Sequence, residues 1–166
     1  THEILTALQV ELTEGEQERV YLRGTSNLEA YFKVIEAREL IRHFNVEENK
    51  KAQQLLNETV ALEPNYAQAY RWLDSSHAMD VWLGVSKSPK DSLEKSIEFY
   101  KKAISLDETM GEAYGSMGFI YVLRKQYEEG LEAMEKGVEL SPNGADTHMY
   151  LGGGMLYADR LDEAIL

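Results

Sequence analysis

The sequence predicts an all-α fold in which pairs of helices stack into an α-α superhelix, and three observations lead to this prediction. A ten-residue phrase occurs three times, at residues 61–70, 105–114 and 139–148, so that successive copies are 44 and 34 residues apart. Between the phrases, apolar residues recur every three or four positions, and no segment shows the strict alternation of a strand. A period in this range is typical of stacked helical repeats.

The composition limits the classes of function. The 166 residues are enough for one domain of ordinary size, and the absence of cysteine excludes disulfides and thiolate metal sites. The net charge of −12 predicts a surface that repels phosphate backbones, so we expect no nucleic-acid partner and no membrane insertion. The sequence shows neither a signal-peptide pattern nor an apolar run of membrane length, which favours a cytoplasmic location.

The N-terminal residues 1–27 match no copy of the repeat. Leu5, Leu8 and Leu12 predict a short amphipathic helix, and Ser26 opens a capping box that starts another helix. Because the chain begins without Met and stops within a helical pattern, we expect it to be part of a longer protein. Residues 1–27 then form a helical connector from an upstream domain.

Each copy of the phrase ends one helix and begins the next. In the third copy, Pro142 cannot continue a helix, and Asn143 or Asp146 can cap the helix that follows. The phrase therefore divides residues 28–166 into units at about 30–66, 67–110, 111–144 and 145–166, the last of them truncated.

The ten additional residues belong to the second unit. Its first helix is expected to run through Trp82 until Gly84 breaks it, and its second helix to begin at Ser88 with Pro89 in the first helical position. This protruding corner makes Trp82 a candidate exposed contact residue.

The pattern within the units resembles the tetratricopeptide repeat, a helix-turn-helix of about 34 residues. The third unit has the aromatic, glycine and tyrosine of that pattern as Tyr114, Gly118 and Tyr121, whereas the second has Asp74 in the glycine slot. The resemblance covers roughly residues 28–166. It implies a right-handed solenoid whose first helices line a concave groove, and a role in protein–protein interaction.

Two glycines depart from this pattern. Gly130 and Gly137 stand in mid-helix where the family usually has alanine. Each is expected to cost about 1 kcal/mol relative to alanine. The second helix of the third unit would then depend on its neighbours for stability.

A narrower resemblance lies upstream. Residues 12–16 and 25–31 look like the junction in bacterial multidomain signalling proteins, where a class III adenylate/guanylate cyclase domain or a TolB-like domain precedes a tetratricopeptide array. The resemblance covers about thirty residues and implies a parent protein of that kind. It places no cyclase in this chain, where no catalytic segment of that family is visible.

We find no catalytic, cofactor or metal motif. His77 and His148 occupy slots for packing residues, and no two histidines are close enough in sequence to form a paired-ligand motif. The acidic clusters are typical of a solvated face, and the glycines at 152–154 lack the lysine and the preceding strand of a phosphate loop. We therefore expect no enzyme activity, no metal and no cofactor in this chain.

The candidate binding site is the concave groove. Stepping three and four residues along the first helices, away from the packing positions, predicts an apolar surface with Phe119 near its middle. A partner peptide or helix with basic flanks would suit such a groove, because acidic residues are expected to rim it. The Lys and Asn residues with which some family members clamp a terminal carboxylate are absent. The predicted groove residues are Gln68, Arg71, Ser75, Met79, Glu112, Phe119, Val122, Leu123, Met149, Leu156 and Tyr157.

The sequence thus predicts an interaction scaffold or regulatory module of a larger bacterial signalling protein, linked to a cyclase if the second resemblance holds. The occupant of the groove is a partner protein or the upstream part of the same protein. The alternative is a structural module that holds the parent protein as an oligomer. Because terminal repeats need a polar cap, we expect the truncated fourth unit either to self-associate or to be stabilised by a helix missing from this chain.

Overall fold

A computed structural model describes residues 24–158, and within that range every regular element is an α-helix. The all-α prediction is confirmed. The predicted connector lies almost wholly outside the described residues, as does the end of the fourth unit. The helices are α3 (Leu28–Arg42), α4 (Val46–Leu62), α5 (Ala67–Trp82), α6 (Pro89–Leu106), α7 (Gly111–Leu123), α8 (Tyr127–Leu140) and α9 (Ala145–Tyr157).

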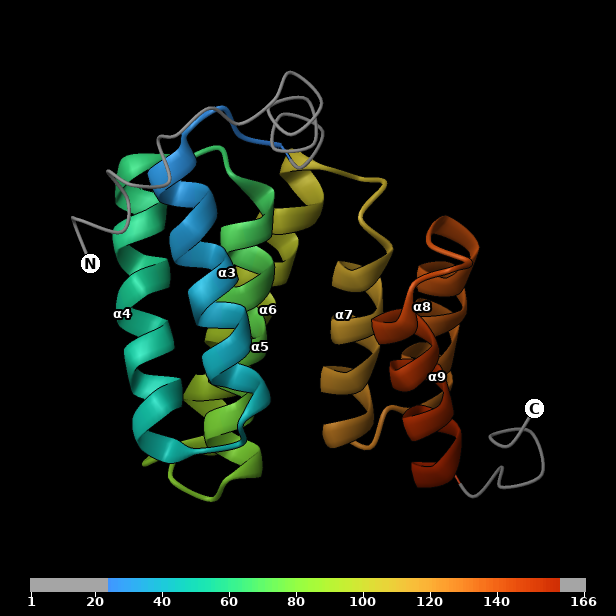
Figure 1. Ribbon diagram of the computed structural model, residues 1–166. Helices are drawn as coiled ribbons and strands as arrows, with labels where there is room; N and C mark the ends of the chain where they lie inside the picture. Colours follow the sequence, from blue (N-terminus) through green and yellow to red (C-terminus); the bar gives the residue numbers. More distant parts are fainter. Residues whose placement is uncertain (1–23, 159–166) are drawn as a thin grey trace.

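The helices pack as antiparallel pairs that stack in chain order. The pairs are α3 with α4, α5 with α6 and α7 with α8, and α9 packs on both α7 and α8. Each first helix also contacts the first helix of the next unit. Figure 1 shows the array extending from the α3–α4 pair on the left to α8 and α9 on the right. The first helices α3, α5, α7 and α9 therefore share one side of a solenoid.

Equivalent residues of different units make equivalent contacts. The Tyr70 hydroxyl donates to the Pro64 carbonyl over 3.1 Å, and His148 Nε2 lies 2.8 Å from the Pro142 carbonyl oxygen. Both aromatic side chains reach back six residues to the proline of the preceding turn. The register read from the repeated phrase is thus the register of the fold.

The inserted corner also follows the prediction. Helix α5 ends at Trp82, and Gly84 adopts a φ of +70°. The Ser88 side chain accepts a hydrogen bond from the Asp91 N–H, with Pro89 at the start of α6. These signals act within one helical turn, which is why the sequence alone reveals them.

Two helix starts differ from the prediction. Asn27, not Ser26, caps α3, and its side chain accepts from the Ala30 N–H over 3.1 Å. At α9 the cap position is Gly144, and neither Asn143 nor Asp146 caps the helix. Asp146 lies in the first turn of α9, beyond the cap position, and its carboxylate pairs with Arg71 of α5.

The interpretation of Gly130 and Gly137 as merely weak helix formers is wrong. At Gly137 an added Cβ would lie 2.7 Å from the Gly111 carbonyl oxygen and 3.1 Å from the Gly115 nitrogen. At Gly130 it would lie 2.9 Å from the Gly118 carbonyl oxygen. These glycines allow the backbones of α7 and α8 to touch, so alanine would not be an improvement.

Two residues after the end of each complete first helix, the backbone φ is positive, at Phe44 (52°), Gly84 (70°) and Lys125 (62°). A non-glycine residue pays about 1 kcal/mol for this conformation. We expect Lys125→Gly to raise the free energy of unfolding by about 0.5 kcal/mol, after the entropy that glycine adds to the unfolded chain is subtracted. Urea denaturation measures this change. Gly84→Ala is the matched control and should destabilise the protein; a loss of stability in Lys125→Gly would contradict the argument.

Candidate functional site

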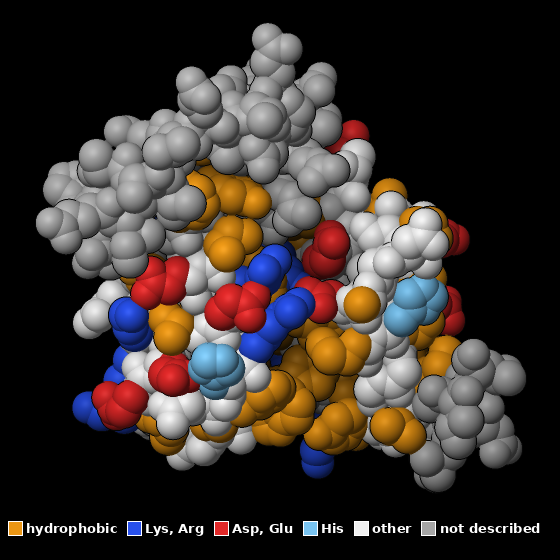
Figure 2. Space-filling model, viewed as in Figure 1, with side chains coloured by type: hydrophobic (Ala, Val, Ile, Leu, Met, Phe, Trp, Pro, Cys, Tyr) orange, Lys and Arg blue, Asp and Glu red, His pale blue; other side chains and the backbone are white. Residues whose placement is uncertain are grey.

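The first helices enclose a groove with a volume of about 340 Å³. Its walls come from α5, α7 and α9 together with the end of α3, and aromatic and methionine side chains make up much of the lining. Figure 2 shows hydrophobic side chains gathered in the lower middle of this face, next to a cluster of charged side chains. The groove thus has an apolar body and a charged end.

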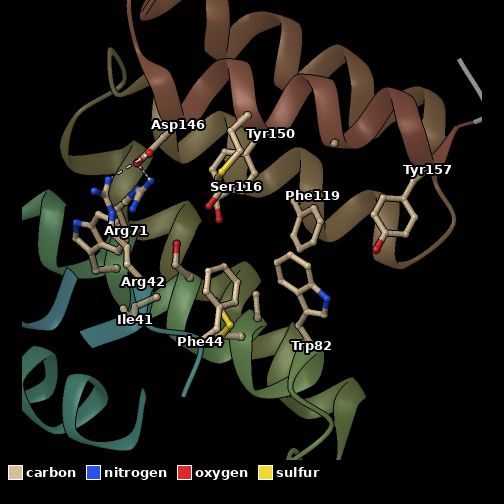
Figure 3. Close-up of a pocket in the computed structure, with 16 residues that line it drawn as sticks. Ile41, Arg42, Phe44, Arg71, Trp82, Ser116, Phe119, Asp146, Tyr150 and Tyr157 are labelled. Atoms are coloured by element: carbon tan, nitrogen blue, oxygen red, sulfur yellow. Dashed lines mark hydrogen bonds and ion pairs between the residues drawn. The ribbon is translucent and has the colours of Figure 1, made fainter. Parts of the chain in front are cut away.

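A row of aromatic rings crosses the apolar body. The ring centroids of Phe44 and Trp82 are 5.6 Å apart, as are those of Trp82 and Phe119, and Phe119 also contacts Tyr150 at 6.1 Å and Tyr157 at 6.5 Å. Figure 3 shows these rings side by side along the groove. Phe44, Trp82 and Tyr157 each expose more than half of their surface. A contiguous apolar patch of this kind is typical of an interaction site.

Phe44 is an unusual member of the row. Its backbone lies in the left-handed region, which bulky residues rarely adopt, and its side chain is 55% exposed. Neither local conformation nor core packing therefore explains a phenylalanine at this turn. Its contact with Trp82 places it at the groove instead.

The charged end is built around Arg71 of α5. Arg71 is 2% exposed, and its Nη2 lies 2.9 Å from Oδ2 of Asp146 on α9. Arg42, at the end of α3, reaches the other oxygen of the same carboxylate at 3.5 Å, as the dashed lines in Figure 3 show. Arg71 also lies against the Trp72 ring, with its guanidinium carbon 3.7 Å from the ring centroid. The carboxylate of Asp146 therefore forms ion pairs with two guanidinium groups.

A second hollow of about 120 Å³ continues beyond the charged end. It shares Arg42, Arg71 and Asp146 with the main groove, and Gln68 and Glu112 line it farther on. The arginines thus stand between two hollows rather than at a closed end.

The structure brings most of the predicted groove residues together. Val122 does not join them: a Cβ on Gly130 would lie 2.8 Å from its side chain, so Val122 points toward α8. Leu123 and Leu156 line neither hollow. Gln68 and Glu112 lie in the second hollow, and the residues in the main groove are Arg71, Ser75, Met79, Phe119, Met149 and Tyr157.

Sequence reasoning missed the contribution of α3. Ile41, Arg42 and Phe44 line the groove, but the first unit matches the repeat pattern too weakly for the helical period to define its inner face. Tyr150 was also missed. Trp82, expected as an exposed contact at the inserted corner, does lie at the groove with 55% of its surface exposed.

A buried carboxylate lies next to the groove, in the glycine slot of the second unit. Asp74 is fully buried and accepts hydrogen bonds from the hydroxyls of Ser96 on α6 and Ser116 on α7. Burial raises the pKa of Asp74 to about 6, although the two hydroxyls and the nearby Arg71 oppose the change. Asp74 thus joins three helices and two units.

Among the described histidines, His77 has a packing role. His77 stacks on Phe99 with ring centroids 5.5 Å apart, and burial lowers its pKa below the ordinary value. Within residues 24–158, no three His, Asp or Glu side chains are arranged to hold a metal ion.

Comparison with known proteins agrees with the repeated helix pairs of the fold. A family model of the tetratricopeptide repeat matches residues 81–110 and 111–143. Residues 81–143 therefore contain tetratricopeptide repeats. Proteins with such repeats generally use them for protein–protein interaction, through the concave surface that the stacked units create. In the described part of this tetratricopeptide array, no helix is both long and apolar enough to cross a membrane.

The tetratricopeptide array is similar to segments of longer proteins. It is 27% identical to the putative adenylate cyclase 3 of Rhizobium meliloti over 80% of this chain and 23% of that protein. It is 26% identical to the transcriptional regulator HilA of Salmonella typhimurium over 93% of this chain and 26% of HilA. The chain thus spans about a quarter of the length of these relatives.

A solved structure supports the fold. The crystal structure of MamA superposes with a TM-score of 0.52 at 21% identity, covering 94% of this chain and 91% of MamA. The likeness concerns the helical architecture alone.

Proposed function

We infer that this tetratricopeptide array is the interaction module of a larger signalling or regulatory protein, and that it binds a segment of a partner in the groove. The row of exposed aromatic rings carries this proposal. The rings contact one another along the array, and three of them expose more than half of their surface. They form an apolar surface before any partner binds, so binding orders few side chains and costs little entropy.

The relatives suggest the kind of parent protein. One is named as a putative adenylate cyclase and another as a transcriptional regulator, and in both the similar segment is about a quarter of the protein. We propose a bacterial parent of the cyclase-linked type that the upstream residues resemble. Any catalytic activity then resides outside this chain, and the array serves recognition.

Phe119→Glu tests the groove. Phe119 lies in the middle of the aromatic row, so a charge at this position should weaken binding of any apolar segment at least tenfold. The probes are peptides enriched on the 166-residue chain from a random-sequence display library, and fluorescence anisotropy measures their dissociation constants. Tyr127→Glu is the matched control, because Tyr127 is partly exposed on α8 and lines neither hollow. Equal weakening by both variants would contradict groove binding.

A structural role is the second candidate, and the surface of α9 favours it. Met149 is 63% exposed and Leu156 is 52% exposed, so α9 presents apolar side chains that another copy of the chain would cover. Light scattering after size-exclusion chromatography distinguishes the two roles. If Phe119→Glu abolishes peptide binding and leaves the oligomeric state unchanged, the recognition role is supported. If the substitution dissociates an oligomer, the assembly role is supported.

A further inference from the structure

Three arginines lie together at the charged end of the groove. Arg71 and Arg42 share the carboxylate of Asp146, whereas Arg38 nearby pairs with Glu39. Glu112 also lines the second hollow, so the acids there match the arginines in number, yet both Arg71 and Arg42 depend on the single carboxylate of Asp146.

Most of the hydrogen-bond donors of Arg71 have no acceptor. Its Nε and Nη1 are buried without a partner, and so is the hydroxyl of Ser75, one helical turn farther along α5 and also in the groove. Buried donors without partners are rare because each one costs free energy. A guanidinium group offers five donors in a planar fork that matches a carboxylate, and here Asp146 takes only one of them.

We propose that the groove accepts an extended peptide in which an internal Asp or Glu lies within a few residues of an aromatic or aliphatic side chain. The carboxylate of the peptide pairs with Arg42 and, behind it, Arg71, while the apolar side chain covers the row from Phe44 to Phe119. This inference rests on the proposed function, and it replaces the expectation that the partner has basic flanks.

The position of the arginines favours a side-chain carboxylate over a chain terminus. The main groove and the second hollow meet at Arg42, Arg71 and Asp146. A peptide that fills the main groove can therefore continue past the arginines into the second hollow. The acidic residue then lies in the interior of the bound segment, with peptide on both sides of it.

Arg42 is the residue to change. Its side chain is 51% exposed, so an incoming carboxylate meets it first, and Arg42→Gln removes the charge without opening the core. Arg71→Gln would disturb a side chain that is 2% exposed, and loss of folding would confuse the result. Lys90→Gln is the matched control: it removes the same charge from a side chain 83% exposed at the start of α6, outside both hollows.

The experiment uses display libraries of random twelve-residue peptides with blocked ends, selected in parallel on the 166-residue chain and on Arg42→Gln. We expect the peptides enriched on the native chain to carry Asp or Glu near an aromatic or aliphatic residue. Replacing that acid by its amide should weaken binding about tenfold on the native chain and on Lys90→Gln, and less than about twofold on Arg42→Gln.

The outcomes separate the two proposals. Enriched peptides that bind through Phe119 but carry no acid, or carry basic residues, would overturn the acidic-peptide inference and leave groove recognition intact. Peptides that need a free C-terminus, when the selection is repeated with unblocked ends, would overturn the assignment of an internal acid. No enrichment on the native chain in either format would overturn both proposals.

Discussion

Replacing Gly137 by alanine is expected to lower the free energy of unfolding by about 2 kcal/mol. The added Cβ would lie 2.7 Å from the Gly111 carbonyl oxygen and 3.1 Å from the Gly115 nitrogen, and these are backbone atoms of α7 that cannot turn aside. The helices would have to separate, and overpacking against backbone atoms is expected to cost about 3 kcal/mol, the upper end of its usual range. This cost exceeds the gain of about 1 kcal/mol that alanine brings to a helix interior.

Gly153→Ala provides the control within the same chain. Gly153 lies inside α9, and an added Cβ would meet no atom within 4 Å. Here only helix propensity acts, so alanine should stabilise the protein by about 1 kcal/mol. Urea denaturation followed by circular dichroism measures both variants. If the two substitutions changed stability in the same direction, the close contact between α7 and α8 would not be the reason for Gly137.

The second large effect is a dependence of stability on pH that comes from Asp74. Its folded-state pKa of about 6 lies above the ordinary value of 3.8. Between these two values the folded protein holds a proton that the unfolded chain has released, so the contribution of Asp74 to stability falls as the pH rises. The difference between the two pKa values corresponds to about 3 kcal/mol, fully present below pH 3.8 and lost above pH 6.

Asp74→Asn isolates this contribution. An amide keeps groups that can hydrogen-bond to the hydroxyls of Ser96 and Ser116 and never carries a buried charge. We expect the variant to be more stable than the native chain at about pH 7.5 by about 3 kcal/mol, and nearly equal to it at about pH 4. Chemical denaturation across this range gives the difference curve.

The exposed Glu108→Gln serves as a control for the general effect of removing one negative charge. The effect assigned to Asp74 is the part of the Asp74→Asn difference curve that exceeds the Glu108→Gln curve. If the two curves coincided, burial would not raise the pKa of Asp74 in the folded protein.

The parts of the fold that the sequence could predict are those set by signals within one helical turn. The end of α5 at Gly84 and the start of α6 at Ser88 and Pro89 were predicted because a left-handed residue, a cap and a proline each act within one turn. The start of α9 was predicted incorrectly. There α9 begins one residue before Asp146, whose carboxylate pairs across the groove with Arg71, 75 residues away in sequence.

Only some residues of the candidate site could be predicted from the sequence. Phe119, Met79 and Tyr157 were found because the helical period orients the inner face of each first helix. Phe44 and Arg42 were not found, since they reach the groove from the end of α3, whose inner face the repeat pattern did not define. Val122 was misplaced because the close approach of α7 and α8 draws its side chain toward Gly130.

By itself the sequence determined the stacked helix pairs, their register and the turns between them, since period, glycine, proline and cap residues act through the backbone over a few positions. Only the tertiary structure decided what the groove contains. Composition predicted an acidic rim, whereas the fold places Arg71 and Arg42 around one carboxylate. Which charged side chains meet depends on which helices face one another across the array. A local sequence pattern contains no information about that arrangement.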